Sequence, residues 1–231
     1  MARIVARGRA CPKHVHPGAA AFRRRLLSWY GRHQRRLPWR GVRDPYAVLV
    51  SEIMLQQTQV ARVTEFYPRF LARYPTLEDL AAASPGAVRE SWDGLGYYAR
   101  ARNLHAAARH VVHAGTGRLP DTVEELRKLP GIGRYTAGAV ASLAFNADVP
   151  AVDTNAARVL ARVFGLRGKP KTARHEHRVW TIAAALVPRN RSADWNQALM
   201  DLGATYCTAR SPRCKACPVR SGCKYLRRRT G

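Results

Sequence analysis

One carboxyl group of this chain lies in surroundings that would change its chemistry. Glu52 is the only charged residue in the apolar stretch 46–57, YAVLVSEIMLQQ. At helical spacing it shares a face with Val48 and Leu49. Burial disfavours the charged form of a carboxyl group, so the protonated acid would persist towards neutral pH, as a general acid requires. The simpler alternative is a glutamate at the rim of a core, paired with an arginine.

A second carboxylate, Asp153, closes a segment with a different chemistry. Residues 129–133, LPGIG, are too few for more than a tight turn between two helical patterns. Gly131 and Gly133 can take positive φ and let a ligand approach the backbone closely. The helix that starts near Arg134 would direct unpaired N–H groups to the same place, which attracts phosphate. This pattern predicts a helix–hairpin–helix that holds a nucleic-acid backbone; the alternative is an ordinary turn followed by an N-cap.

Four cysteines near the C-terminus have the spacing of a metal site. The pattern is Cys207-x6-Cys214-x2-Cys217-x5-Cys223, with no histidine in the set. Zinc sites usually show two separate CxxC pairs, so the loose spacing favours a [4Fe-4S] cluster over zinc. Disulfides are improbable inside a cell. We expect a structural cluster, because all four ligand positions are filled by protein.

The charge of the chain indicates a polyanionic partner. Its 231 residues carry a formal net charge of +25. Residues 1–40 hold eleven Lys or Arg and no acid, and no acid follows Asp201. A GC-rich genome, which favours arginine and alanine, would contribute to this bias without explaining the acid-free ends. No apolar run could span a membrane and no signal core opens the chain, so we expect a cytoplasmic protein.

The elements that must position these residues are predicted to be helices, because apolar residues recur at helical spacing along the chain. We expect a basic disordered tail over 1–18, helices over 19–34, from Asp44-Pro45 to about 57, and onward to about 74. Two short helices should follow, then a basic helix after the Gly94–Tyr98 turn, with the hairpin over about 122–145. Further helices are predicted at about 154–164, 172–187 and 194–209. No strand alternation is visible, and the fold class is predicted to be all-α.

Together these pieces resemble the helix–hairpin–helix DNA glycosylases of the endonuclease III superfamily, and within it the MutY adenine glycosylases. The resemblance covers roughly residues 19–225. The strings that carry it are Leu37-Pro38-Trp39, 51–60 (SEIMLQQTQV), 94–104 (GLGYYARARNL), 200–204 (MDLGA) and the cysteine spacing. It implies two helical modules that flank a cleft: a six-helix module over 44–151, and a cluster module made of 19–43 and 152–231.

The resemblance also implies roles for individual residues. Glu52 would protonate the N7 atom of adenine, Asp153 would stabilise the oxocarbenium charge of the sugar, and Asn155 would help to hold the site. Relatives that also cut the strand carry a lysine where this chain has Tyr135, so little lyase activity is expected. Contacts with mismatched double-stranded DNA are expected from Trp39, Gln56, Gln57, Tyr97, Arg100, Leu129, Gly131, Gly133 and Arg134.

The substrate follows from the resemblance rather than from any single residue. It implies a monofunctional, monomeric glycosylase of base excision repair that removes adenine opposite 8-oxoguanine or guanine. The chain stops just after the cluster loop, where many MutY proteins continue into a domain that senses 8-oxoguanine. A thymine/uracil–G mismatch glycosylase is the alternative, because that shorter relative also has a tyrosine at the place of Tyr135.

Overall fold

The protein is entirely helical in the part that its structure, a computed structural model, describes, namely residues 18–170 and 172–230. No strand occurs in these residues, so the predicted all-α class is confirmed. The predicted basic tail lies outside them, apart from Gly18. None of the described helices combines the length and the apolar character needed to cross a bilayer.

Twelve α-helices and two short 3₁₀-helices make up this part of the chain. They are α1 (Ala19–His33), α2 (Pro45–Met54), α3 (Val60–Arg73), α4 (Leu77–Ala82), α5 (Pro85–Glu90), α6 (Ala99–His113), α7 (Val123–Leu126), α8 (Arg134–Leu143), α9 (Thr154–Phe164), α10 (Ala173–Leu186), α11 (Ser192–Thr205), η1 (Cys214–Ala216), η2 (Arg220–Gly222) and α12 (Lys224–Thr230).

Helix starts follow the capping residues of the sequence. The Asp44 carboxylate accepts the N–H of Ala47, and Pro45 occupies the first turn of α2. The helix predicted at 194–209 has other bounds: α11 begins at Ser192, after Asn190 in a left-handed conformation with φ 59°. It ends at Thr205 because the N–H of Cys207 turns back to the carbonyl of Leu202, at 2.8 Å.

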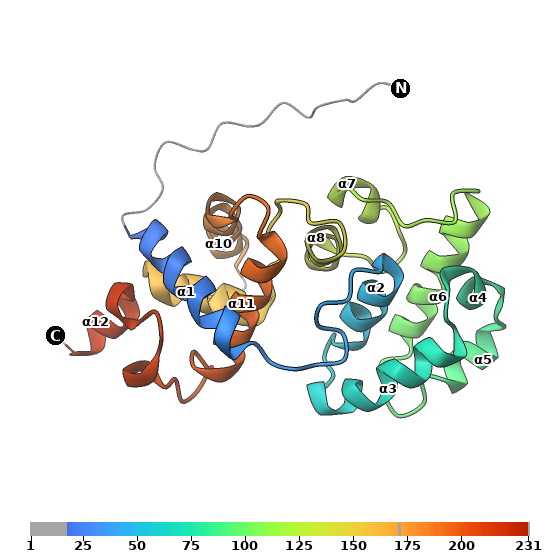
Figure 1. Cartoon of the computed structure of the whole chain (residues 1–231), viewed down its shortest axis with the longest axis horizontal. Helices are drawn as coiled ribbons and strands as arrows, with labels where there is room; N and C mark the ends of the chain where they lie inside the picture. The colour runs from blue at the N-terminus through green and yellow to red at the C-terminus, as the bar shows by residue number, and fades with distance from the viewer. Residues whose placement is uncertain (1–17, 171, 231) are drawn as a thin grey trace, which may run out of the picture.

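The helices form two groups (Figure 1), and each group encloses a hydrophobic core of its own. One is formed by α2 to α8, and the other by α1 with α9, α10 and α11. The division falls close to the predicted modules, although Trp39 and Met200 belong to the first core. Module boundaries at residues 44 and 151 remain a prediction.

Helix α8 joins the two cores, because it packs against both α2 and α11. Asn196 of α11 is buried; its amide donates to Ser142 Oγ of α8 at 3.0 Å and accepts the N–H of Ala151 at 3.0 Å. One turn earlier on the same face of α8, a Cβ at Gly138 would lie 2.4 Å from the Pro150 carbonyl oxygen. The segment that leads to Asp153 is therefore fixed directly against α8.

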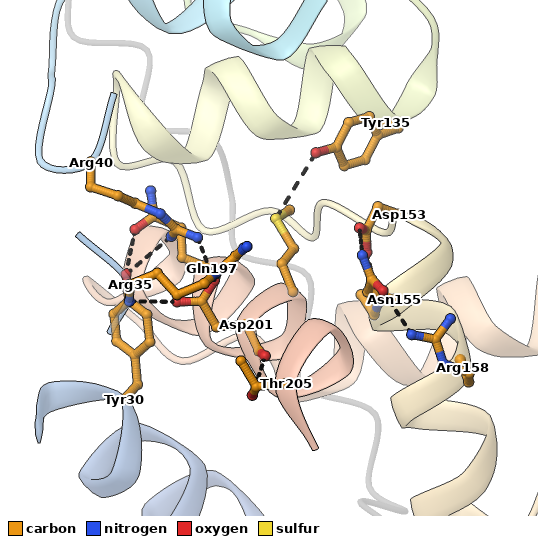
Figure 2. A network of polar contacts seen from close by, with 12 residues as sticks. Tyr30, Arg35, Arg40, Tyr135, Asp153, Asn155, Arg158, Gln197, Asp201 and Thr205 are labelled. Atoms are coloured by element: carbon orange, nitrogen blue, oxygen red, sulfur yellow. Dashed lines mark hydrogen bonds and ion pairs between the residues drawn. The ribbon is translucent and has the colours of Figure 1, made fainter. Parts of the chain in front are cut away.

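A buried carboxylate ties the segment between α1 and α2 to the second core. Asp201 of α11 is fully buried and accepts the backbone N–H of Arg35 at 3.1 Å and its Nε at 2.7 Å. Arg40 donates to the same carboxylate at 2.6 Å (Figure 2). One acidic side chain thus holds the segment that passes between the cores at two points, near its start and near its middle.

Replacing Asp201 by asparagine should lower the free energy of unfolding by roughly 3 kcal/mol or more, because it leaves Arg40 without its buried counter-ion. Urea denaturation measures this change. Asp194→Asn is the matched control: its ion pair with Arg191 is about half exposed on both sides, so its loss should cost no more than about 1 kcal/mol. Equal losses in the two variants would contradict the assigned role of Asp201.

Candidate active site

A cavity of about 600 Å³ lies between residues of both cores and gathers the predicted catalytic residues. Its lining includes Glu52, Tyr135, Asp153, Asn155, Trp39, Gln56 and Gln57. Helix α2 supplies the first of these and helix α8 the second, while the aspartate stands at the start of α9. Residues that are a hundred positions apart in the chain thus share one chamber that is large enough for a nucleobase.

Glu52 is 4% exposed, and its carboxylate accepts a hydrogen bond of 2.6 Å from the hydroxyl of Tyr135. Burial raises the pKa of Glu52; the negative charge of Asp153 adds to this, while the Tyr135 hydrogen bond and the positive charge of Arg40 oppose it. Burial and the charge of Glu52 also raise the pKa of Tyr135 well above its ordinary value, so its hydroxyl stays a donor. The arrangement favours a protonated carboxyl group inside the cavity.

Asp153 lies in a polar chain that continues away from the cavity (Figure 2). One of its oxygens caps α9 by accepting the N–H of Ala156 at 2.7 Å, and the other accepts the amide of Asn155 at 2.8 Å. Arg158 in turn donates to the Asn155 side-chain oxygen at 2.7 Å and to the carbonyl of Cys207 at 2.7 Å. Asp153 is therefore an oriented acceptor whose position is linked to the cysteine loop.

The four predicted metal ligands lie around one small pocket. Cys207, Cys214, Cys217 and Cys223 are half-buried, and none of them forms a disulfide. Burial raises the pKa of the Cys217 thiol to about 11. Across the described ranges, no set of three or more His, Cys, Asp or Glu side chains has the arrangement of a bound metal ion. The structure thus brings the cysteines together, and their cluster remains a prediction.

The two glycines of the hairpin between α7 and α8 have different backbone conformations. Gly131 has φ 74°, and a Cβ there would lie 2.5 Å from the Asn103 Cβ, so this turn requires glycine twice over. Gly133 has φ −84°, so the positive φ foreseen for it is wrong; a Cβ there would meet only open space. Arg134 lies with its guanidinium 3.9 Å from the centre of the Trp180 ring.

The other predicted DNA contacts differ in exposure. Tyr97 is 60% exposed and Gln57 is also exposed, whereas Gln56 donates its amide to Thr136 Oγ1 of α8 at 3.3 Å. Leu129 and Trp39 are buried in the first core, and Trp39 presents part of its surface to the cavity. A direct contact with DNA is therefore best supported for the exposed pair.

Arg100 occupies an interior position that its predicted contact with DNA does not explain. It is 8% exposed, and its guanidinium donates to protein oxygens around it, including the Met54 carbonyl at 2.8 Å. Its two terminal nitrogens are committed to internal acceptors and its Nε is buried, so no donor of this arginine is presented to a phosphate outside the protein. Its geometry supports a positioning role.

Two residues that matter to the site did not stand out in the sequence. Arg158 holds Asn155, and Arg40 adds positive charge near Glu52. A signal existed for Arg158, since it follows Asn155 by three positions and so lies beside it on the same helix. Nothing local marked Arg40, because its partner Asp201 is distant in the sequence.

Comparisons with known proteins agree with this geometry. Residues 50–184 match the HhH-GPD superfamily of base excision DNA repair proteins. The adenine DNA glycosylase of Rattus norvegicus is 49% identical, with 94% of this chain and 44% of that protein covered. For the adenine DNA glycosylase of Mycolicibacterium smegmatis the identity is 46%, over 87% of this chain and 68% of that protein. The chain thus spans less than half the length of its rat relative.

Solved structures of similar shape include two DNA repair enzymes. A thermostable thymine-DNA glycosylase superimposes with a TM-score of 0.84 at 32% identity, over 91% of this chain and 97% of that one. A non-covalent endonuclease III–DNA complex gives a TM-score of 0.77 at 25% identity, over 91% of this chain and 95% of that one.

Tyr135→Phe should raise the pKa of Glu52 further, because it removes the hydrogen bond that stabilises the carboxylate. Glu52 should then stay protonated to higher pH than in the parent protein. Titration of the labelled glutamate carboxyl carbons by NMR measures the shift, with Tyr98→Phe on the surface as the control. An unchanged or lowered pKa in Tyr135→Phe would show that this hydroxyl does not govern the acid.

Proposed function

The chain belongs to the HhH-GPD superfamily of base excision DNA repair proteins, and we propose that it is a monofunctional glycosylase that removes adenine mispaired with 8-oxoguanine or guanine. The observation that carries the proposal is that buried Glu52 and oriented Asp153 line one cavity. The adenine DNA glycosylases among its relatives support the choice of base. Because the chain covers only 44% of the rat protein, the identity of the substrate is part of the proposal.

Glu52 is the general acid of the proposed reaction. Its raised pKa keeps a proton available inside the cavity, and transfer of that proton to adenine N7 makes the base a better leaving group. As the bond between the sugar carbon and the base nitrogen breaks, the electron pair of that bond goes to the base, which leaves as neutral adenine. The protonation state of Glu52 therefore controls the first step.

Asp153 is the negative charge of the proposed reaction. The positive charge that develops on the sugar as the base departs would be stabilised by this carboxylate, which Ala156 N–H and Asn155 hold in one orientation. Water then adds to the sugar carbon, and the proton it loses goes to the Glu52 carboxylate, which restores the acid. Two carboxyl groups of opposite protonation state in one site serve glycosidic cleavage in the same way.

Tyr135 supports hydrolysis without strand cleavage. A lyase needs an amine that forms a Schiff base with the sugar, and the phenol at this position instead donates its proton in a hydrogen bond to Glu52. Little or no lyase activity is therefore part of the proposal.

Double-stranded DNA is the proposed partner. The start of α8 has no side-chain cap and lies beside exposed Gly131 and Gly133, where a phosphate would meet a positive helix end. Exposed Gln57 and Tyr97 would contact the duplex near the cavity. The formal charge of +25 adds a non-specific attraction that salt weakens. Action as a monomer and a cytoplasmic location are further parts of the proposal.

A [4Fe-4S] cluster is proposed for the cysteine pocket. Four free thiols line one pocket together with apolar residues such as Val159 and Leu202, and this donor set fits an iron–sulfur cluster. Arg162 donates to Cys207 Sγ at 3.4 Å, a contact that would favour thiolate charge. The cluster would supply structural stability to the loop and take no part in base removal.

Thymine or uracil opposite guanine is the second candidate substrate. The thymine-DNA glycosylase covers 91% of this chain at 32% identity, which favours this alternative over any other chemistry. The charged side chains that line the cavity, Arg35, Arg40, Glu52 and Asp153, are compatible with either a purine or a pyrimidine.

A panel of duplexes tests the proposal directly. Duplexes with A·8-oxoguanine, A·G, T·G and U·G are incubated with the protein and then treated with alkali to reveal abasic sites. We expect strand breaks at adenine only, and none before alkali. Breaks only at T or U would support the second candidate, and a borohydride-trapped covalent adduct would contradict the role given to Tyr135.

Glu52→Gln should lower the single-turnover excision rate by about 10²- to 10⁴-fold, because the amide cannot supply a proton. Its fold should be kept: the raised pKa means that ionising Glu52 costs stability as pH rises, and the amide avoids this cost. Melting temperature and DNA affinity are the controls. A variant that binds, folds and still excises at the parental rate would remove Glu52 from the mechanism.

Protein purified without exposure to oxygen should be brown and contain about four iron atoms per chain if the cysteine pocket holds the proposed cluster. Iron and sulfide assays measure this content. Cys214→Ser should lower it, because it removes one of the four ligands. Stoichiometric zinc in a colourless preparation would overturn the cluster assignment.

A further inference from the structure

Every donor nitrogen at the end of the Arg100 side chain is directed at oxygens of two separate turns. Its acceptors are the carbonyls of Ile53 (3.1 Å), Met54 (2.8 Å), Gln56, Leu95 (3.2 Å) and Gly96 (3.0 Å), and Thr58 Oγ1 (2.9 Å). Ile53 and Met54 are the last two residues of α2, Gln56 and Thr58 lie in the turn that follows it, and Leu95 and Gly96 lie in the turn that precedes α6. No salt-bridged carboxylate accompanies this arginine in the described residues, so backbone dipoles take up its charge.

Each of these two turns contains a residue in a strained conformation. Gln57 has φ 56° and Tyr97 has φ 50°, a region that residues other than glycine adopt rarely. Such conformations persist only where the surroundings over-determine them, and they concentrate at functional sites. The acceptors of Arg100 flank both residues, since Gln56 and Thr58 enclose Gln57, and Gly96 precedes Tyr97.

The strained residues are also the exposed ones. Tyr97 is 60% exposed, with its ring centre 5.5 Å from the Arg100 guanidinium carbon. Gln57 is exposed and lines the mouth of the cavity that holds Glu52. A buried cation therefore lies behind two protruding side chains and contacts the loops of both.

We propose that Arg100 is a positioning residue that locks the turns at Gln57 and Tyr97 into one shared conformation, so that the two side chains meet the DNA duplex as a fixed pair. The link between the turns stands on the geometry alone. Its consequence for DNA rests on the proposed function: a fixed pair would assist the target base in leaving the stack, a step that precedes the chemistry at Glu52.

Amide hydrogen exchange tests the link between the turns. Arg100→Lys keeps the charge but offers three donors on one atom, which cannot reach both turns. Exchange at the N–H groups of Gln56 and Leu95 should rise together by about tenfold or more, as expected for lost charge-assisted hydrogen bonds. Arg73→Lys is the matched control, since the contacts of Arg73 are with Glu90 and the Tyr74 ring, outside both turns.

Faster exchange in one turn only, or in neither, would overturn the proposal. Arg100→Gln, which buries no charge, repeats the measurement in case the lysine variant loses protection throughout α6. The same joint rise is expected from it, and protection retained at both turns would count against the proposal.

A DNA measurement then distinguishes positioning from general destabilisation. Single-turnover excision by Arg100→Lys should fall about tenfold or more for adenine in a stacked pair, yet stay within about twofold of the parent for adenine opposite an abasic site, where extrusion costs little. Equal losses on both substrates would overturn the positioning role. If the parent protein excises no adenine at all, the proposed function fails while the exchange result still decides the link between the turns.

Discussion

The ion pair of Asp201 with Arg35 and Arg40 fixes the position of a positive charge that acts on the acid of the cavity, Glu52. Arg40 lies close enough to Glu52 to pull its pKa down, but its guanidinium is engaged by the fully buried Asp201. Desolvation therefore remains the larger influence on Glu52, and the carboxyl keeps its proton. The same ion pair holds the segment between α1 and α2. Asp201 therefore determines both where Arg40 lies and how its charge acts on the cavity.

Much of the fold could be predicted because its signals are local. The cap at Asp44 and the spacing after Asp153 give the starts of α2 and α9 as the structure has them. A lone charge in an apolar run also indicated that Glu52 would be buried, and it is 4% exposed. That Glu52, Tyr135 and Asp153 would line one cavity could be expected only from the family resemblance, because no local pattern relates residues so far apart in the sequence.

The other features of the fold and the site depend on tertiary contacts, which cannot be predicted from composition or local pattern. Arg100 has the appearance of a surface cation, and only the folded chain reveals the turn carbonyls that surround it. The burial of Leu129 could not be predicted either, because a leucine in a hairpin can face a ligand or a core; in the structure it is buried. The end of α11 at Thr205 arises from the return of the Cys207 N–H to Leu202, a local bond whose cause is the cysteine loop beyond it.

Helix α8 has a consequence for where along a strand the protein can act. Its first turn carries both the N–H groups proposed to hold a phosphate and Tyr135, which donates to the acid on α2. The spacing between such a phosphate and Tyr135 is set by the geometry of one helix, and the hydrogen bond to Glu52 and the packing of α8 against α2 extend it to the acid. In the proposed function, this helix would act as a molecular ruler that fixes how many nucleotides separate the bound phosphate from the base that enters the cavity.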